Sequence, residues 1–292
     1  MVDGAVAARR GNTGADRIGF LGHATVLIEL EGVRLLTDPL LRGRVAHLRR
    51  RAPMPGEELF ADLDAVLISH LHHDHLDLAS LRRLGRDTPL IVPRGAGSWL
   101  EERGFRLVTE LSVGEVAQVD ALQVRAVRAD HDARRPGGPH VDAVGYLVGS
   151  PPATEDEPVV GEPAEGEPEV DKTGEGKHTP RGRDVYFAGD TALYPGMADL
   201  TPSLDVALVP VAGWGPKLGP GHMGPLEAAE AVALMRPRLT IPVHWGTLLP
   251  IGLGHSHGKQ LTEPPRLFAE QVARLAPSVE VRIVSPGQEM VL

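Results

Sequence analysis

The segment that most constrains this chain is SHLHHDHLD at residues 69–77, where histidines and aspartates directly follow an apolar run. That run, DAVLIS at residues 64–69, is typical of a short strand buried on both faces. An extended segment that leaves such a strand alternates its side chains. His70 and His72 therefore fall on one face and can bind one metal ion together, whereas His73 points away and is expected to tolerate substitution.

The second half of the same segment predicts a second pair of ligands. If the chain turns into a helix at Leu76, Asp74 and His75 lie at the turn and are free to reach another metal ion. A histidine-rich surface turn is the alternative, but His-x-His-x-Asp-His directly after a buried strand favours metal binding strongly. Because the chain contains no cysteine, any metal must be held by histidine and carboxylate, which suit zinc, iron or manganese.

The composition narrows the class of protein. The 292 residues are 42% hydrophobic and 24% charged, as in soluble globular proteins with a sizeable core. The formal net charge is −9, and residues 151–183 hold nine acidic but only four basic side chains. A strong nucleic-acid binder would show a basic excess instead. The sequence has neither a signal-peptide pattern nor a run of about 18 apolar residues that would predict a transmembrane helix, so we expect a cytoplasmic protein.

The order of apolar runs and turn residues predicts one domain. We expect residues 1–16 to be a disordered lead-in and residues 17–292 to form a single domain with a disordered, acidic, Pro/Gly/Glu-rich insertion at about 150–183. Strand character resumes at DVYFAGD directly after the insertion, so we interpret it as a connection between two strands. Strands and helices mix in both halves, which predicts an α/β (α+β) fold with sheets packed between helices.

Local patterns locate several elements. The runs at 26–30 and 33–37 predict antiparallel strands joined by a turn at Glu31 and Gly32. Helices are expected at residues 76–84, 97–103, 225–235 and 264–277.

Six motifs of the chain resemble, in order, those of a known family. SHLHHDHLD is similar to the His-x-His-x-Asp-His signature of the metallo-β-lactamase superfamily. The resemblance covers nearly the whole chain from residue 18. It is strongest with the branch that contains N-acylphosphatidylethanolamine-hydrolysing phospholipase D and ascorbate-6-phosphate lactonase. The motifs that carry it are LGHATVLIE, LLTDP, DAVLISHLHHDHLD, FAGDT, GHMGPLEAAEA and PVHWGT.

This resemblance implies a four-layer αβ/βα sandwich with a binuclear metal site at one end of the paired sheets. It implies two divalent ions, zinc first, with Mn²⁺ or Fe²⁺ as alternatives. Residue by residue, it implies two ligand sets and one bridging residue: His70, His72 and His131 on the first ion, Asp74, His75 and His244 on the second, and Asp190 between them. Taken alone, the three ligands outside residues 70–75 are open to structural interpretations, as a surface histidine, a turn aspartate and a core histidine.

The implied chemistry is hydrolysis by a metal-bridging hydroxide, which needs no serine or cysteine nucleophile. Asp190 would hold both ions, and Asp74 would act through the second ion. His222, in GHMGPLEAA just before a predicted helix, resembles a histidine near the active site of this branch. We expect it to contact the substrate or the leaving group, and a capping role in the loop is its alternative.

Four further residues have two interpretations each. His23 either lines the site or packs structurally, and Asp77 either orients a ligand imidazole or caps the following helix. His255 and His257 either form a third metal pair or belong to a flexible glycine-rich surface loop, which we favour.

The favoured substrate is a phosphodiester, either a small molecule or a lipid, cleaved by a phospholipase D-like enzyme. A lactonase acting on a small sugar-phosphate lactone is the second hypothesis and a nuclease the third. A non-catalytic metal-binding regulatory protein is the alternative of another class, and the presence of all seven ligand positions argues against it.

A cluster of arginines precedes the metal segment. These side chains could attract a phosphate or make weak peripheral contact with an anionic membrane, whereas a solvated loop is the alternative. The cluster consists of Arg42, Arg44, Arg49, Arg50 and Arg51.

Overall fold

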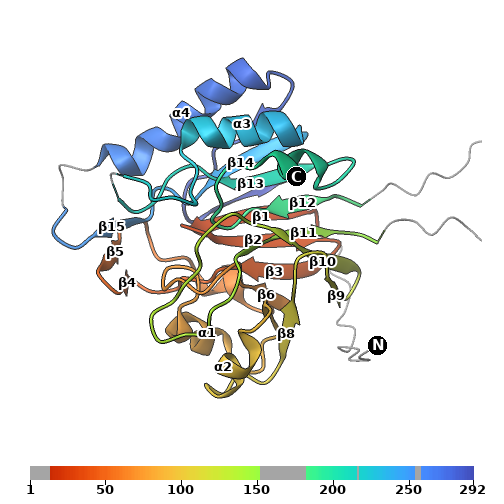
Figure 1. Cartoon of the computed structure of the whole chain (residues 1–292), viewed down its shortest axis with the longest axis vertical. Coiled ribbons are helices and arrows are strands. Elements are labelled where there is room, and N and C mark those ends of the chain that lie inside the picture. Colours follow the sequence, from red (N-terminus) through yellow and green to blue (C-terminus); the bar gives the residue numbers. More distant parts are fainter. Residues whose placement is uncertain (1–13, 152–181, 216, 254–257) are drawn as a thin grey trace, which may run out of the picture.

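Two seven-stranded sheets pack face to face in the centre of the computed structural model, which describes residues 14–151, 182–215, 217–253 and 258–292 (Figure 1). The first sheet has the strand order β17-β1-β2-β3-β6-β7-β8. Its strands are β1 (Arg17–Gly22), β2 (Thr25–Leu30), β3 (Val33–Thr37), β6 (Ala65–Leu67), β7 (Leu90–Pro93), β8 (Val108–Leu111) and β17 (Gln288–Val291).

The second sheet has the order β16-β14-β13-β12-β11-β10-β9. Its strands are β9 (Val116–Val119), β10 (Leu122–Arg128), β11 (Val144–Gly149), β12 (Val185–Phe187), β13 (Val206–Pro210), β14 (Leu239–Val243) and β16 (Glu280–Val281). A small third sheet, of order β15-β5-β4, joins β4 (Arg44–Val45), β5 (Leu48–Arg50) and β15 (Leu248–Pro250).

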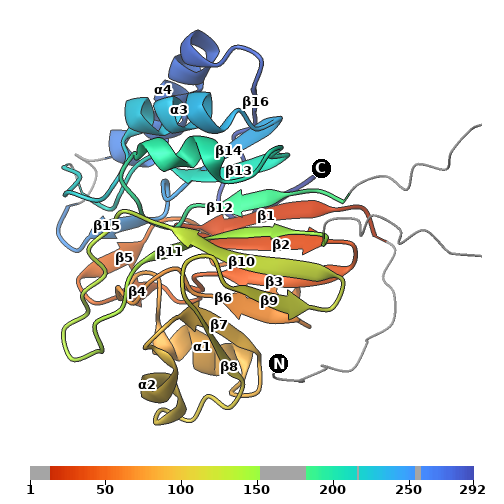
Figure 2. The same ribbon diagram turned by 45° about the vertical axis from the view of Figure 1, so that its right-hand side comes forward.

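Helices cover both outer faces of the paired sheets. Helices α3 (Pro225–Met235) and α4 (Lys259–Leu275) lie over the second sheet, and α1 (Leu78–Leu84) and α2 (Gly97–Glu101) lie on the far side of the first (Figure 1). Two 3₁₀ turns, η1 (Glu57–Phe60) and η2 (Pro195–Asp199), complete the described elements. Figure 2 shows the two sheets overlying one another between the helix layers. The expected class, an αβ/βα sandwich, is confirmed.

Strand β2 shows why both faces of the first sheet are apolar. Val26, Ile28 and Leu30 belong to the core between the sheets. Leu27 points the opposite way and joins the core that contains Leu81 of α1 and other residues under the helices. Alternation along a strand sends successive side chains to opposite faces, so a strand in this position needs apolar residues on both faces, and the buried Glu29 of β2 is paired with Arg34.

The local predictions hold with few exceptions. β2 and β3 are antiparallel, and Glu31 and Gly32 between them have φ angles of 51° and 82°, as a tight hairpin turn requires. Helix α4 begins at Lys259, not at residue 264, so Pro264 and Pro265 lie inside it. The helix continues through the prolines because its buried face, with Phe268 and Val272, packs onto the core.

The small third sheet has no counterpart among the predicted elements. Its strands are two or three residues long, too short to show a period in the sequence. Strands β11 and β12 are antiparallel neighbours, so the acidic insertion connects adjacent strands, but most of its residues lie outside the described part of the chain. Within the described part, no helix has the length and apolar character needed to cross a membrane.

Candidate metal centre

The predicted ligands converge from loops at one edge of the paired sheets. Strands β12, β13 and β14 are mutually parallel, as are β3, β6 and β7, so their carboxyl ends meet at a common edge of each sheet. Functional loops commonly lie at such an edge in α/β folds. Residues 70–75 follow β6, His131 follows β10, Asp190 follows β12 and His244 follows β14.

Three histidines form the first group. The Nε2 atom of His70 lies 3.0 Å from Nδ1 of His72, and Nε2 of His131 lies 3.1 Å from the same Nδ1. His70 is fully buried, whereas His72 and His131 are half-buried. Three imidazole nitrogens within reach of a common point are the arrangement that a tetrahedral metal site requires.

The second group combines His23, Asp74, His75 and His244, whose ligand atoms all lie within 4.8 Å of one another. His75 Nε2 lies 3.2 Å from His244 Nε2 and 3.9 Å from Asp74 Oδ2. His23 Nε2 approaches the same carboxylate oxygen of Asp74 at 2.9 Å. His23 therefore lines the site, one of the two roles that the sequence left open.

Asp190 lies between the two groups. Its Oδ2 atom is 3.2 Å from His75 Nε2 and 4.0 Å from His70 Nε2, and its Oδ1 atom is 3.2 Å from His244 Nε2. The residue is buried, with 3% of its surface exposed, yet Oδ1 makes no hydrogen bond within the described part of the chain. A buried carboxylate oxygen without a hydrogen-bond partner is costly unless a cation satisfies it.

The outward nitrogens of four histidines are already occupied. The Nδ1 atom of His75 faces Asp38 Oδ2 at 2.7 Å, and that of His244 faces the carbonyl of Ala212 at 2.6 Å. His131 Nδ1 faces the carbonyl of Gly221 at 2.9 Å. An acceptor at Nδ1 fixes the proton there, which leaves Nε2 with a free lone pair.

His70 follows the same rule through a hydroxyl group. Ser69 Oγ donates to Asp38 Oδ2 at 2.6 Å and therefore accepts from Nδ1 of His70 at 3.0 Å. All four Nε2 atoms point into the centre. The donor set of imidazole and carboxylate fits zinc, iron or manganese, so the residues present fit the divalent cations that the family signature implies.

Burial keeps most of these imidazoles uncharged. It lowers the pKa of His70 well below the usual range and also lowers the pKa values of His72 and His131. It lowers the pKa of His244 to about 3. Neutral imidazole is the form that binds a metal ion, so these four side chains are ready to bind at neutral pH.

Asp190 and His75 shift each other's pKa values. Burial acts to raise the pKa of Asp190, but its interactions with His244, His75 and His222 outweigh burial and hold that pKa well below the usual range. For His75 burial acts downward, and the carboxylates of Asp190 and Asp38 raise its pKa well above the usual range. Two anionic side chains around one buried imidazole provide the negative charge that a cation would neutralise.

His222 lies at the solvent side of Asp190. Its Nε2 atom is 3.4 Å from Asp190 Oδ2, and its side chain is 25% exposed. Its Nδ1 atom faces the carbonyls of Gly219 and Pro220, both at 3.1 Å. Burial acts to lower the pKa of His222, but the hydrogen bond to Asp190 outweighs burial and raises it.

The other candidate residues lie outside the two ligand groups or outside the described residues. His73 is exposed and belongs to no cluster of ligand atoms in the described residues. Asp77 caps α1, since its Oδ2 accepts from the backbone N–H of Ser80 at 2.9 Å. His255 and His257 lie outside the described residues.

One supporting residue, Asp38, was not predicted from the sequence. Asp38 is fully buried and accepts hydrogen bonds from the backbone and hydroxyl of Ser69, as well as from His75. Its only sequence signal is its position directly after an apolar strand, in LLTDP, which is also a common position for a turn aspartate.

Comparisons with known proteins identify the family. A family model described as the β-lactamase superfamily domain matches residues 33–155 and 178–245. An N-acyl-phosphatidylethanolamine-hydrolysing phospholipase D of Caenorhabditis elegans is 30% identical over 260 residues, which cover 80% of this chain but only 64% of that protein. A metal-dependent hydrolase of Methanopyrus kandleri is 32% identical over 276 residues, which cover 93% of this chain and 98% of that protein.

A solved structure supports the fold. A metallo hydrolase from the archaeon Ignicoccus hospitalis superposes with a TM-score of 0.66, over 95% of this chain and 98% of that one. The sequence identity is 20%.

Proposed function

The chain belongs to the β-lactamase superfamily as a metal-dependent hydrolase, and from this premise we propose that it uses a binuclear centre to cleave a phosphodiester. In this proposal His70, His72 and His131 would hold one ion. Asp74, His75 and His244 would hold the other, and the carboxylate of Asp190 would be shared. Zinc suits the donor set best, because imidazole predominates over carboxylate.

One observation carries the binuclear assignment. Asp190 contacts histidines of both ligand sets, because its Oδ2 lies 4.0 Å from His70 Nε2 and 3.2 Å from His75 Nε2. Its Oδ1 lies 3.2 Å from His244 Nε2 and has no hydrogen-bond partner in the described residues. A carboxylate that served only as a structural acceptor would have both oxygens hydrogen-bonded at this depth. A shared ligand between two cations accounts for both its position and its unsatisfied oxygen.

The substrate class follows from the chemistry of such a pair and from one relative. When bound, two divalent cations supply charge stabilisation at a phosphoryl group and a water of lowered pKa. The C. elegans relative is named as a phospholipase D, which supports a phosphodiester before a lactone. The chain is net acidic, which disfavours a nucleic-acid substrate.

The remaining side chains are assigned by their positions. His23 donates to Asp74 Oδ2 and so orients that carboxylate. His222 has its Nε2 at the solvent side of Asp190, where a leaving oxygen would emerge. A protonated Nε2 would face the Asp190 carboxylate and would donate its proton to the leaving oxygen, which is the role of a general acid.

The test compares Asp190→Asn with His73→Ala, a change in the same region that removes an exposed imidazole. We expect Asp190→Asn to bind fewer than two ions per chain and to lower the kcat for bis-p-nitrophenyl phosphate by roughly 100- to 1000-fold or more. His73→Ala should keep both ions and nearly full activity. Metal content by elemental analysis and initial rates are the two readouts.

The wild-type protein provides the outcomes that would overturn the proposal. Fewer than two ions bound per folded chain would refute the binuclear centre. A substrate panel of the phosphodiester, a phospholipid, lactones and RNA tests the reaction, and hydrolysis of lactones alone would refute the phosphodiester assignment.

A further inference from the structure

The hairpin formed by β4 and β5 carries four arginines on one face. Arg44 stands directly opposite Arg49 in the antiparallel register. The pairing continues where Arg50 N donates to the carbonyl of Gly43, which brings Arg42 opposite Arg51. Alternation sends all four side chains to the same side, and all four are exposed, whereas Val45 and Leu48 point inward and are buried. We call these four residues the arginine face.

This arrangement is unfavourable unless an anion lies over it. Like charges directly opposite one another on antiparallel strands destabilise the pair. Residues 39–56 contain no Asp or Glu. Of the four arginines of this face, only Arg42 contacts a carboxylate in the described part of the chain, that of Asp77 at 3.3 Å. The fifth arginine of the segment, Arg50, is different: it is buried and donates to the backbone carbonyls of Leu21, Leu40 and Pro53.

Two large apolar side chains lie beside the hairpin. Ile251, which is 50% exposed, donates its backbone N–H to the carbonyl of His47 at 2.8 Å. Trp214, which is 36% exposed, packs edge-on to the His47 ring with the centroids 4.9 Å apart. Cationic and exposed apolar groups side by side, with a tryptophan among them, are the composition of surfaces that bind at a membrane interface.

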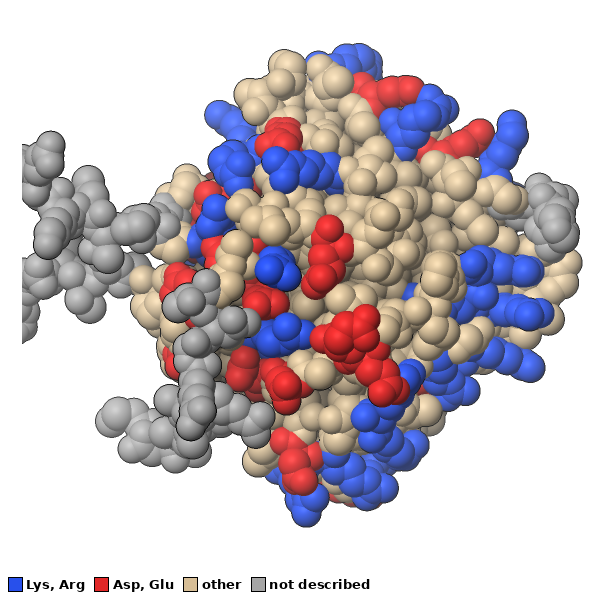
Figure 3. Space-filling view, turned by 180° about the vertical axis from the view of Figure 1, so that it is seen from behind, with Lys and Arg blue, Asp and Glu red and all other residues tan. Residues whose placement is uncertain are grey.

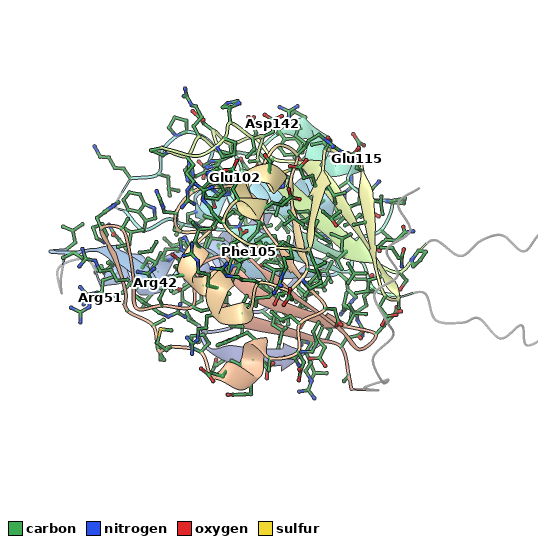
Figure 4. The ribbon with its side chains drawn as sticks, turned by 90° about the horizontal axis from the view of Figure 1, so that it is seen from below. Arg42, Arg51, Glu102, Phe105, Glu115 and Asp142 are labelled. Carbon is green, nitrogen blue, oxygen red and sulfur yellow. The ribbon has the colours of Figure 1, made fainter. Side chains whose placement is uncertain are left out.

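This surface is close to the candidate metal centre. Arg42 contacts Asp77, which ends the histidine segment. Trp214 lies two residues after Ala212, whose carbonyl accepts from His244. Figure 4 shows Arg42 and Arg51 projecting on the same side of the molecule, and Figure 3 shows basic side chains gathered along that side, at the right of the view.

We propose that the arginine face, with Trp214 and Ile251, docks on a bilayer that carries anionic phospholipids. The docked orientation brings the solvent side of the metal centre close to the lipid headgroups. The inference deepens the proposed function, because it rests on that function for the identity of the substrate as a membrane phosphodiester. A nucleic acid suits the chain less well, since its formal net charge is −9.

The test measures co-sedimentation of the metal-loaded protein with vesicles of phosphatidylcholine, with and without phosphatidylglycerol. Each arginine near an anionic leaflet contributes roughly fivefold to partitioning, so Arg44→Gln/Arg49→Gln should reduce binding about 25-fold. The control Arg238→Gln/Arg274→Gln removes the same charge from exposed positions at the opposite end of β14 and on α4. Trp214→Ser should weaken binding to both kinds of vesicle, and raised salt should release the wild-type protein.

The outcomes separate docking from catalysis. Equal binding to both kinds of vesicle, or equal losses in the hairpin and control variants, would overturn the docking surface. So would wild-type protein that binds RNA or inorganic phosphate through these arginines but does not sediment with anionic vesicles. Hydrolysis of the water-soluble bis-p-nitrophenyl phosphate should be the same in the hairpin variant and in the wild type. If wild-type protein sediments as expected but cleaves no phosphodiester, the proposed reaction fails and the docking surface stands.

Discussion

His23 faces the candidate centre with its Nε2 atom, and that atom lies against a carboxylate, not against another imidazole. Its Nε2 reaches Asp74, its ring lies against His244 with the centroids 3.9 Å apart, and its backbone carbonyl accepts from His244 N at 2.8 Å. The side chain thus holds two residues of the second ligand group at once. It acts by positioning these ligands, since outer hydrogen bonds fix how a ligand presents itself.

Replacing His23 tests this role. We expect His23→Phe to weaken binding of the second ion by roughly 10- to 100-fold, because the donor to Asp74 is lost. His23→Gln keeps a donor and should recover part of the affinity. Both variants share the left-handed backbone at this position, where φ is 58°, so backbone strain cancels between them. Titration with a competing chelator reports the two affinities separately, and an unchanged second affinity in His23→Phe would contradict the role.

The ligands that spacing alone identified are those whose signal is local. His70, His72, Asp74 and His75 stand in one short segment, so their spacing alone indicated metal binding. His131, Asp190 and His244 gave no local signal, and only the family resemblance brought them into the ligand sets. The contact of His23 with Asp74 depends on how β1 and β2 pack against the rest of the fold, which spacing along the chain does not reveal.

Among the elements, the ends of β3 and β6 are joined by one carboxylate. Asp38 follows β3 and accepts from Ser69 N at 2.7 Å, from Ser69 Oγ at 2.6 Å and from His75 Nδ1 at 2.7 Å. It therefore fixes the turn that starts the histidine segment. Burial raises the pKa of Asp38, and His75 partly opposes that rise.

Loss of this carboxylate should destabilise the fold itself. Asp38→Ala leaves three buried donors without a partner, so we expect the free energy of unfolding to fall by about 3 kcal/mol. Asp87→Ala removes an exposed carboxylate paired with Arg106 and should leave that free energy almost unchanged. Urea unfolding of the metal-free proteins is the measurement, because it excludes any effect through bound ions. Equal stability of the two variants would show that Asp38 has no such role.

The short elements were the ones that the sequence could not predict. Helix α3 was located at its observed bounds because its eleven residues carry both a proline start and buried alanines on one side. Strands β4, β5 and β15 are defined by their pairing with one another and by buried Leu48 and Leu248, not by a pattern of their own. The arginine cluster was visible in the sequence, but its division into four outward side chains and one buried side chain required the register.

At the scale of the whole molecule, the candidate centre ties the two sheets together. The first sheet supplies the histidine segment after β6, and the second supplies His131, Asp190 and His244. Bound ions would therefore link the two halves of the sandwich. Because such ions bind only the folded state, they would also stabilise that state.

Removal of the ions should lower the melting temperature. With ions at about 1000 times their Kd, binding adds about 4 kcal/mol to the stability, so a chelator should reduce Tm by several degrees. Addition of zinc should restore it. Asp190→Asn should show a much smaller change between the two conditions. Calorimetry with and without chelator measures the shift, and identical melting of the wild type in both would contradict a link between the sheets.

The pairing of β17 with β1 has a consequence for the order of events in folding. Arg17 lies opposite Val291, so the outer side of β1 is paired only when residues far apart along the chain meet. Contacts of such long range form slowly, because a large loop must close before they contribute. Until β17 arrives, β1 presents an unpaired edge to solvent, and such edges recruit strands from other molecules. During synthesis β1 would therefore keep an unpaired edge until residues 288–291 have been made, and strands of other molecules would compete with β17 for that edge.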